Sequence, residues 1–173
     1  MSNRNEDNKA DSSLFRHKLD KAARFGEVYE IVKETVRHSL GKHRVGMMLY
    51  LDDLPLQVGA YHPVGTNSII MNRALLRIVE ATVSSKQLVN AFVYTILLHE
   101  YIHSIGYLQE ETVRRLVQKV SLDCFGEDHP ASRLSRMGPW SLLRGVPLKD
   151  TEAPQRVMEI VKDFERSNQS YIS

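Results

Sequence analysis

The chain has 173 residues, a net charge of +2, and 42% hydrophobic and 25% charged residues. This length suits one domain with its own core, and the charge alone does not indicate a nucleic acid or membrane partner. The single cysteine, Cys124, excludes an intrachain disulfide and fits a reducing compartment. The first residues lack the apolar segment of a secretory signal, and no apolar run reaches the roughly 18 residues of a membrane span. We therefore expect a cytoplasmic protein with no membrane partner.

The N-terminal half of the chain predicts a helix followed by short strands. Residues 1–12 are polar and charged, which is typical of a disordered tail, and residues 13–173 would form the single domain. Apolar residues recur near helical spacing from Ser13 to Leu40, and Gly41 favours a stop. A buried strand is expected at Val45–Leu51. The segments QVGAYH and NSIIMN, on either side of PVGT, predict a hairpin or a bulged pair of strands.

The C-terminal half predicts mostly helices. RALLRIVEAT is expected to be a short helix, a long helix should run from about Ser85 to Ile105 and stop at Gly106, and another should run from about Glu110 to Phe125. Residues 131–152 are loop-like with short helical pieces, and APQRVMEIVKDFER predicts a C-terminal helix. This order of elements indicates an α+β fold, with a small, mostly antiparallel sheet packed on a buried helix.

The segment LLHEYIHSIGYLQEE has two histidines, His99 and His103, around Glu100. Residues four apart share one face of a helix, so both imidazoles can bind one ion at about 2.0–2.1 Å. Glu100 is rotated by roughly 100° from His99, so it can contact a metal-bound water without binding the metal. A charge on Glu100 in this apolar helix would be costly unless it met a cation or a solvent-filled cleft. The pattern predicts Zn²⁺ on the two histidines and Glu100 as general base, against the alternative of two buried core histidines.

HEYIH on a buried helix, after a small sheet, resembles the zincin metalloproteases. The resemblance implies that His99 and His103 are zinc ligands and that Glu100 is the base and proton shuttle of peptide hydrolysis. It also implies that the strand Asn67–Asn72 is the edge strand that aligns an extended substrate. HEYIHSIGY is similar, too, to a pattern of the bacterial rRNA-maturation endoribonucleases, which have a histidine at the position of Gln109 and usually lack the glutamate.

A catalytic zinc site of this kind needs a third protein ligand and an open position for water. Metzincins have a glycine where this chain has Gly106, and a third histidine where it has Gln109. A gluzincin-like site would instead take a glutamate from the following helix. Glu110 lies about 70° from the centre of the apolar stripe of that helix and Glu111 about 170° away, so Glu110 is preferred. His129, about 22 Å along a straight helix from the motif, is the remaining alternative.

Four further residues are candidates for secondary roles. Met137 could form a Met-turn beneath the zinc, as in metzincins, although methionines are also common in cores. Tyr61, His62 and Tyr107 could donate a hydrogen bond to a developing oxyanion, and the sequence does not choose among them.

Together these features predict a zinc metallopeptidase of the minimal gluzincin type, acting on a protein or peptide substrate. One alternative is a metal-dependent hydrolase acting on RNA, suggested by the basic residues of the second half of the chain: Arg114, Arg115, Lys119, Arg133, Arg136, Arg144 and Lys149. The other is a non-catalytic zinc-binding interaction module, whose site should be closed by four protein ligands. The sequence does not indicate an oligomeric state.

Overall fold

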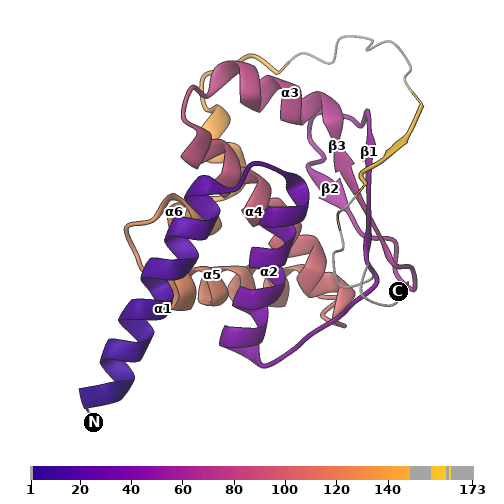
Figure 1. Cartoon of the computed structure of the whole chain (residues 1–173). Coiled ribbons are helices and arrows are strands. Elements are labelled where there is room, and N and C mark those ends of the chain that lie inside the picture. Colours follow the sequence, from indigo (N-terminus) through magenta and orange to yellow (C-terminus); the bar gives the residue numbers. More distant parts are fainter. Residues whose placement is uncertain (1, 149–156, 163, 165–173) are drawn as a thin grey trace.

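Helix α4, Lys86–Ser104, lies in the middle of the fold, and most of the other helices and the sheet pack around it (Figure 1). The computed structural model describes residues 2–148, 157–162 and 164. Every residue from 90 to 98 is buried, which is expected for a helix that is apolar on all sides. The fold is α+β, as predicted. None of the helices in the described ranges has the length and apolar character that crossing a membrane requires.

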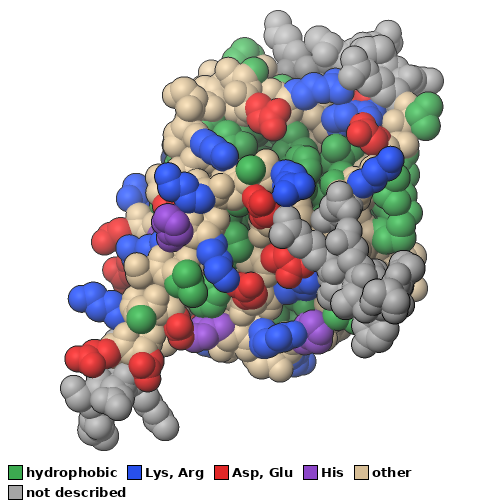
Figure 2. Space-filling view, viewed as in Figure 1, with side chains coloured by type: hydrophobic (Ala, Val, Ile, Leu, Met, Phe, Trp, Pro, Cys, Tyr) green, Lys and Arg blue, Asp and Glu red, His purple; other side chains and the backbone are tan. Residues whose placement is uncertain are grey.

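Two helices, α1 (Ser2–Lys21) and α2 (Phe25–Leu40), replace the single helix expected before Gly41. Because α1 begins at Ser2, residues 2–12 are helical, in contrast to the disordered tail predicted there. Figure 2 shows this end of the chain projecting from the body with charged side chains of both signs around it. Only the second half of α1 packs on the core, where Phe15 is buried. Helix α2 ends as predicted, at Gly41 with a φ of 66°.

The break between α1 and α2 depends on a side chain that is distant in sequence. The carboxamide of Asn90, on α4, donates hydrogen bonds of 2.9 Å to the carbonyl oxygens of Leu19 and Ala22. On the other side of the break, the carboxylate of Glu27 accepts the backbone N–H of Ala23 at 2.5 Å. These contacts pair groups that helix ends leave without partners. The spacing of apolar residues continues through the break, so this spacing does not predict that the helix is interrupted there.

Four strands form one mixed sheet in the order β2-β3-β1-β4: β1 (Met48–Asp52), β2 (Ala60–Tyr61), β3 (Ser68–Asn72) and β4 (Glu159–Ile160). The two central strands, β1 and β3, are parallel along their whole length, and β2 and β4 add short antiparallel pairs at the edges. The expected β2–β3 hairpin is present. The sheet was expected to be mostly antiparallel, but its longest pairing, between β1 and β3, is parallel. The reason is that β2 lies at the edge of the sheet and the hairpin returns β3 beside β1, in the same direction as β1.

Asn72 ends β3 and caps helix α3, Arg73–Thr82, which forms where a short helix was predicted. Its side-chain oxygen accepts the backbone N–H groups of Ala74 and Leu75. Its amide group donates to three carbonyl oxygens of the loop that leads to β2, those of Leu54, Pro55 and Val58. Because Asn72 is fully buried and hydrogen-bonded on all sides, it fixes the position of that loop.

Strand β4 shows that the C-terminal helix predicted over 153–166 is wrong in its described part, 157–162. The backbone N–H of Val161 donates to the carbonyl of Leu49 at 2.9 Å, so this segment pairs with β1. Pairing gives the edge of β1 the hydrogen bonds it would otherwise lack. The local spacing of apolar residues does not reveal such a partner. Apart from Phe164, the rest of the expected helix lies outside the described residues.

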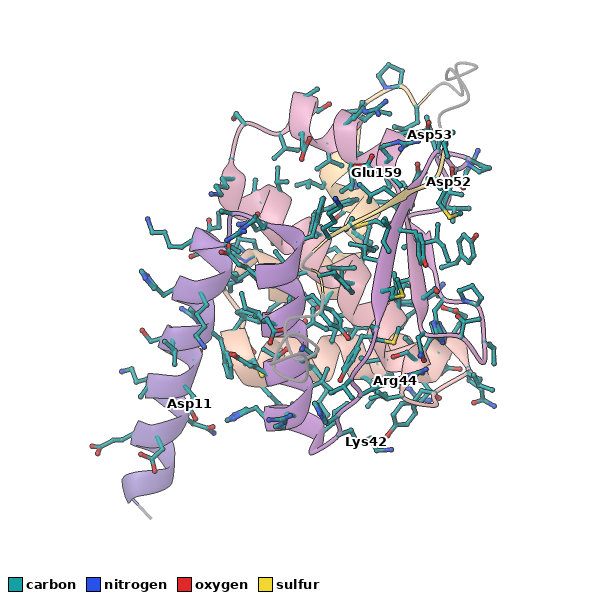
Figure 3. All side chains as sticks on the ribbon, turned by 45° about the vertical axis from the view of Figure 1, so that its right-hand side comes forward. Asp11, Lys42, Arg44, Asp52, Asp53 and Glu159 are labelled. Atoms are coloured by element: carbon teal, nitrogen blue, oxygen red, sulfur yellow. The ribbon has the colours of Figure 1, made fainter. Side chains whose placement is uncertain are left out.

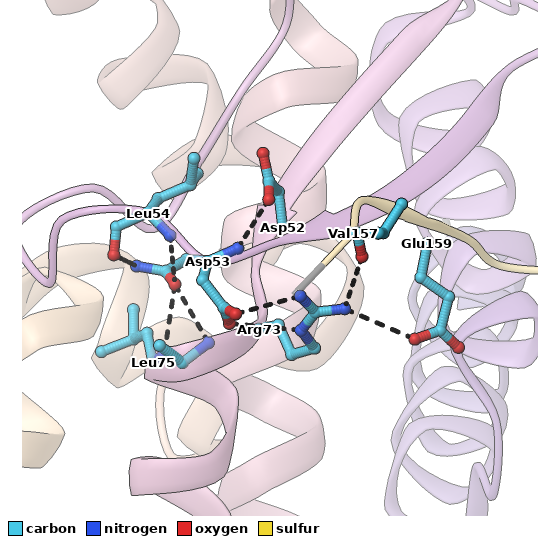
Figure 4. Close-up of polar contacts among 9 residues, drawn as sticks. Asp52, Asp53, Leu54, Arg73, Leu75, Val157 and Glu159 are labelled. Atoms are coloured by element: carbon cyan, nitrogen blue, oxygen red, sulfur yellow. Dashed lines mark hydrogen bonds and ion pairs between the residues drawn. The ribbon is translucent and has the colours of Figure 1, made fainter. Parts of the chain in front are cut away.

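Arg73 connects the first turn of α3 to the end of β1 and to the β4 segment (Figure 4). Its guanidinium contacts both carboxylate oxygens of Asp53, at 3.2 and 3.0 Å, and also donates to the carbonyl of Val157 at 3.3 Å and pairs with Glu159 at 3.5 Å. The side chains of Arg73 and Asp53 are only 9% and 13% exposed. The labels of Asp53 and Glu159 in Figure 3 lie at one end of the sheet, opposite to Arg44.

The remaining helices follow the sequence closely. Helix α5 covers Glu110–Phe125, as predicted, and α6 (Pro130–Met137) and the short 3₁₀ helix η1 (Pro139–Leu143) are the short helical pieces expected after it. Burial raises the pKa of Cys124 to about 12, so this thiol acts as a small hydrophobic group. The buried stripe of α5 includes Val113, Val117 and Val120.

We predict that Arg73→Leu lowers the free energy of unfolding by about 3 kcal/mol, because it leaves the Asp53 carboxylate buried without its partner. Arg77→Leu is the matched control, since Arg77 is exposed on the same helix and should change stability by less than about 0.5 kcal/mol. Urea denaturation of both variants measures the difference. Equal losses in the two variants would contradict the anchoring role of Arg73.

Candidate metal centre

Helix α4 and the turn that follows it bring three potential metal ligands together. His99 and His103 lie on the same face of α4, with ring centroids 5.0 Å apart. After α4 the chain reverses at Gly106, whose φ of 111° strongly favours glycine and whose N–H donates to the carbonyl of His103 at 3.0 Å. Helix α5 then begins at Glu110, directly opposite the two imidazole rings.

The side chain of Glu110 contacts both histidines. One carboxylate oxygen is 3.1 Å from Nε2 of His99, and the other is 2.9 Å from Nε2 of His103. One ligand atom from each of the three residues lies within 4.8 Å of the others. No other group of this kind is found in the part of the chain that the structure describes.

The hydrogen bonds of His103 orient its ring toward Glu110. Its Nδ1 donates to the backbone carbonyl of Tyr107 at 2.8 Å, because this oxygen can only accept. Its Nε2 faces the carboxylate of Glu110 at 2.9 Å, and either a proton on Nε2 or a bound metal ion would join these two groups. Two imidazole nitrogens and one carboxylate are a ligand set typical of catalytic zinc, so the residues present fit this ion.

Two basic residues hold the turn after α4 in place. The ammonium group of Lys42 lies 4.6 Å from the centroid of the Tyr107 ring, a cation–π contact. The guanidinium of Arg44 donates to the carbonyl of Ser104, at the end of α4, and to the side chain of Asn67, before β3, at 2.7 Å. The labels of Lys42 and Arg44 lie at the same end of the molecule in Figure 3. The carbonyl that orients His103 is therefore part of a supported turn.

Glu100 lies beside the three ligands without joining them. The residue is 8% exposed, and burial, together with the negative charge of Glu110, raises the pKa of Glu100 to about 8, although a hydrogen bond from the backbone of His62 acts to lower it. A cation held by the three ligands would oppose both effects that raise the pKa. A carboxyl group balanced in this way near neutral pH suits general acid–base chemistry.

The pKa values of His99 and Glu110 are both shifted downward. Burial lowers the pKa of His99, and the negative charge of Glu110 offsets only part of this effect. Burial acts to raise the pKa of Glu110, but the adjacent His99 and His103 outweigh it and lower this pKa. A neutral imidazole and an ionised carboxylate are the forms in which these side chains bind metals.

A cleft of about 590 Å³ contains His99, Glu100 and Glu110. It is bounded by α4, by the segment that leads into β2, by α5, and by the end of α6 with the start of η1. Besides the site residues, it is lined by Gln57, Val58, Gly59, Ala60, Thr95, Ile96, Arg114, Val117, Gln118, Ser135, Arg136, Met137, Gly138, Pro139 and Trp140.

The alternative third ligands lie elsewhere. The side chain of Glu111 is 87% exposed and faces Arg115 at 3.7 Å. His129 caps α6, and its side chain is 3% exposed and 2.9 Å from Asp20. Neither belongs to the cluster of ligand atoms. The geometry therefore favours Glu110, as the helical angles indicated.

The secondary candidates are not in the expected positions. A Met-turn methionine would be buried under the metal, whereas Met137 is 54% exposed on the rim of the cleft. Tyr61, His62 and Tyr107 do not line the cleft. Instead, Nδ1 of His62 contacts the carbonyl of Ser68. The backbone of His62 hydrogen-bonds to Glu100, and the backbone carbonyl of Tyr107 hydrogen-bonds to His103.

The position of β3 corrects the expected edge strand. β3 lies inside the sheet, between β2 and β1, so it cannot present a free edge. β2 is the edge strand on this side, and residues 57–60, which lead into it, line the cleft. The apolar run of NSIIMN is explained by its burial on an interior strand.

From the sequence, Arg114 and Arg136 were expected only as part of the positive charge of the second half of the chain, whereas in the structure both line the cleft. Arg114 follows Glu110 by four residues, and this spacing could have shown that both share one face of α5. Arg136 carries no such local signal, because the packing of α6 against α4 and α5 brings it to the cleft.

Comparisons of the chain with protein-family models, with curated proteins and with solved structures found no match.

His129 has a structural role that depends on its neutral form. Its Nδ1 accepts the backbone N–H of Ala131 at 3.1 Å, so Nε2 carries the proton and donates to Asp20 at 2.9 Å. The ring stacks on Phe125, with centroids 4.9 Å apart. Burial lowers the pKa of His129 and outweighs the opposing effect of Asp20.

We predict that acid destabilises the fold through His129. Because its pKa in the folded state lies below the ordinary value of 6.5, the unfolded chain binds the proton more readily. The stability it contributes is complete above about pH 6.5 and is lost as the pH falls through the folded-state pKa. His129→Asn keeps a capping acceptor but does not titrate, so its free energy of unfolding should fall less between about pH 7 and pH 5. Parallel curves for the variant and the wild type would disprove this role.

Proposed function

We propose that this protein is a zinc-dependent metallopeptidase of the zincin type with a gluzincin-like ligand set. The observation that carries the proposal is a division of roles within one cleft. His99, His103 and Glu110 converge on one point, while Glu100, from the same helix, lies next to them and is not part of the cluster. Three ligands and an adjacent carboxyl group are what metal-assisted hydrolysis requires.

Each residue would have a defined part in the reaction. Nε2 of His99, Nε2 of His103 and the carboxylate of Glu110 would hold the ion. When bound there, zinc would supply a Lewis acid that lowers the pKa of water to about 7. Glu100 would accept the proton of the attacking water and then donate it to the leaving amine nitrogen, acting as base and afterwards as acid. The carbonyl of Tyr107 keeps His103 in the tautomer that leaves Nε2 free for the metal.

The edge of the sheet supports a peptide as substrate. β2 pairs with β3 on one side, and no strand of the described ranges pairs with its other side. Residues 57–60 continue this edge into the cleft beside His99 and Glu100. An extended peptide can pair with such an edge through main-chain hydrogen bonds. Asn72 supports this wall by binding the carbonyl of Val58 at 2.9 Å.

Two alternatives have less support. A structural zinc site is closed by four protein ligands, and three gather here in the described part of the chain. An RNA hydrolase would need a continuous basic surface at the cleft, but the ammonium group of Lys119 is paired with Asp123 at 2.5 Å. The cytoplasmic location stays a prediction from composition.

We predict that the purified protein binds about one equivalent of zinc, measured by elemental analysis. His99→Ala should abolish binding, and Glu110→Gln should weaken it roughly 10- to 100-fold, because each removes a ligand atom. Glu111→Gln is the matched control, since this neighbouring carboxylate faces away from the site and its loss should leave zinc binding unchanged. At a free zinc concentration of 100 Kd, the wild type should gain about 2.7 kcal/mol in stability. A wild type without metal after zinc is supplied would refute the site.

We predict that Glu100→Gln keeps its zinc but cleaves peptides at least about 100-fold more slowly, because the amide cannot accept the proton of the water. A mixed peptide library, analysed by mass spectrometry with zinc-loaded wild type, identifies the substrate for this comparison. Glu111→Gln again serves as control and should cleave at the wild-type rate. Full activity of Glu100→Gln would rule out its role as base, and a zinc-loaded wild type that cleaves no peptide would rule out the proposed function.

A further inference from the structure

The five basic residues of α5 and α6 fall into two groups. Three of them are tied to neighbours on the surface: Arg115 to Glu111, Lys119 to Asp123, and Arg133 to the carbonyl of Asp128. The other two, Arg114 and Arg136, line the cleft, and neither has an ion pair or a hydrogen-bond partner within the described residues. Two exposed arginines at the wall of the cleft are therefore unpaired within the described residues.

These two arginines approach the cleft from different elements. Arg114 lies one turn after Glu110 on α5, on the same helical face. Arg136 lies near the end of α6, which packs against both α4 and α5. The acidic residues that line the cleft are Glu100 and Glu110, and both already belong to the metal site. The arginines consequently have no carboxylate partner left inside the cleft.

We infer that Arg114 and Arg136 form an anion subsite that binds a carboxylate of the substrate. This inference rests on the proposed function, and it defines the substrates as peptides that carry either an acidic side chain or a free C-terminal carboxylate close to the scissile bond. A guanidinium matches a carboxylate with two parallel hydrogen bonds, which gives orientation as well as affinity.

The surroundings of the two arginines favour a peptide carboxylate over a nucleic acid backbone. The lining around them includes apolar side chains, namely Ile96, Val117, Met137, Pro139 and Trp140. A polynucleotide backbone is bound by a row of unpaired basic groups that follows its phosphates, and the neighbouring basic residues of α5 and α6 are engaged elsewhere. One carboxylate held between two arginines, next to apolar side chains of the same peptide, suits this lining better.

The test compares matched substrates on matched variants. Four zinc-loaded proteins are assayed: the wild type, Arg114→Gln, Arg136→Gln and the control Arg115→Gln. The substrates are a peptide that the wild type cleaves, versions of it in which each acidic residue near the scissile bond is changed to its amide, and a version with an amidated C-terminus. The wild type should prefer the carboxylate-bearing peptide by about 10-fold in kcat/KM, mostly through KM. The preference should disappear in Arg114→Gln and Arg136→Gln and persist in Arg115→Gln.

The substrate series also identifies the source of the carboxylate. Loss of the preference on amidation of the C-terminus assigns the subsite to the terminal carboxylate, and loss on changing an internal residue assigns it to that side chain. A wild type with no preference for any carboxylate overturns the inference, as does an equal loss in Arg115→Gln.

A binding measurement separates this inference from the proposed function. Zinc-loaded Glu100→Gln is titrated into fluorescein-labelled peptide pools that differ only in a Glu or a Gln at one fixed position, and binding is followed by fluorescence anisotropy. Tighter binding of a Glu pool than of its Gln pool supports the subsite even if no peptide is cleaved, provided that the difference is lost in the double variant that also carries Arg114→Gln. A second pair of pools, with a free or an amidated C-terminus, tests the terminal carboxylate in the same way. Equal binding within both pairs of pools overturns the inference, and so does stronger binding of a single-stranded RNA oligonucleotide that depends on the same arginine.

Discussion

The burial of an ionisable site within the central helix is the constraint on which the rest of this structure depends. Helix α4 is buried over most of its length, yet its last turns carry His99, Glu100 and His103. A carboxylate as enclosed as that of Glu100 is costly without a positive partner or access to solvent. The cleft over the end of α4 gives this carboxyl group access to solvent, whereas Glu110 at the start of α5 places a second negative charge beside it, which a bound cation would offset. The end of α4 therefore places ionisable groups directly beside the apolar core.

The supporting contacts lie around the ends of the elements rather than in their middle. Asn90 terminates α1, Asn72 binds the loop before β2, Arg44 ties the end of α4 to the β2–β3 loop, and Arg73 holds the β4 segment at the end of β1. In each case one polar side chain satisfies one or more backbone groups that regular structure leaves unpaired. These contacts fix the relative positions of α4 and the sheet edge, and therefore the shape of the cleft.

The proposed chemistry depends on two neighbouring helices, whereas the cleft around it is assembled from several parts of the fold. The proposed metal ligands and Glu100 lie on two helices joined by a short turn, so their geometry is set locally by α4, Gly106 and the start of α5. Arg114 and other cleft residues also lie on these helices, but the rest come from the loop before β2 and from the α6–η1 region, which are far apart in the sequence. Rigid helices suit a site in which distances must be held closely, while the surrounding loops can change without disturbing it.

The sequence by itself determined the features that depend on local spacing. Helical periodicity located α4 and α5, Gly41 and Gly106 marked the two turns, and the angle along α5 placed Glu110 rather than Glu111 toward the two histidines. Only the tertiary structure decided the features that depend on distant partners. The break after α1 requires Asn90, β4 requires the free edge of β1, and the places of β2 and Arg136 beside the cleft require the packing of the sheet and α6 on α4. A local pattern records which face of a segment is apolar, but it does not record which other segment will cover that face or supply its missing hydrogen bonds.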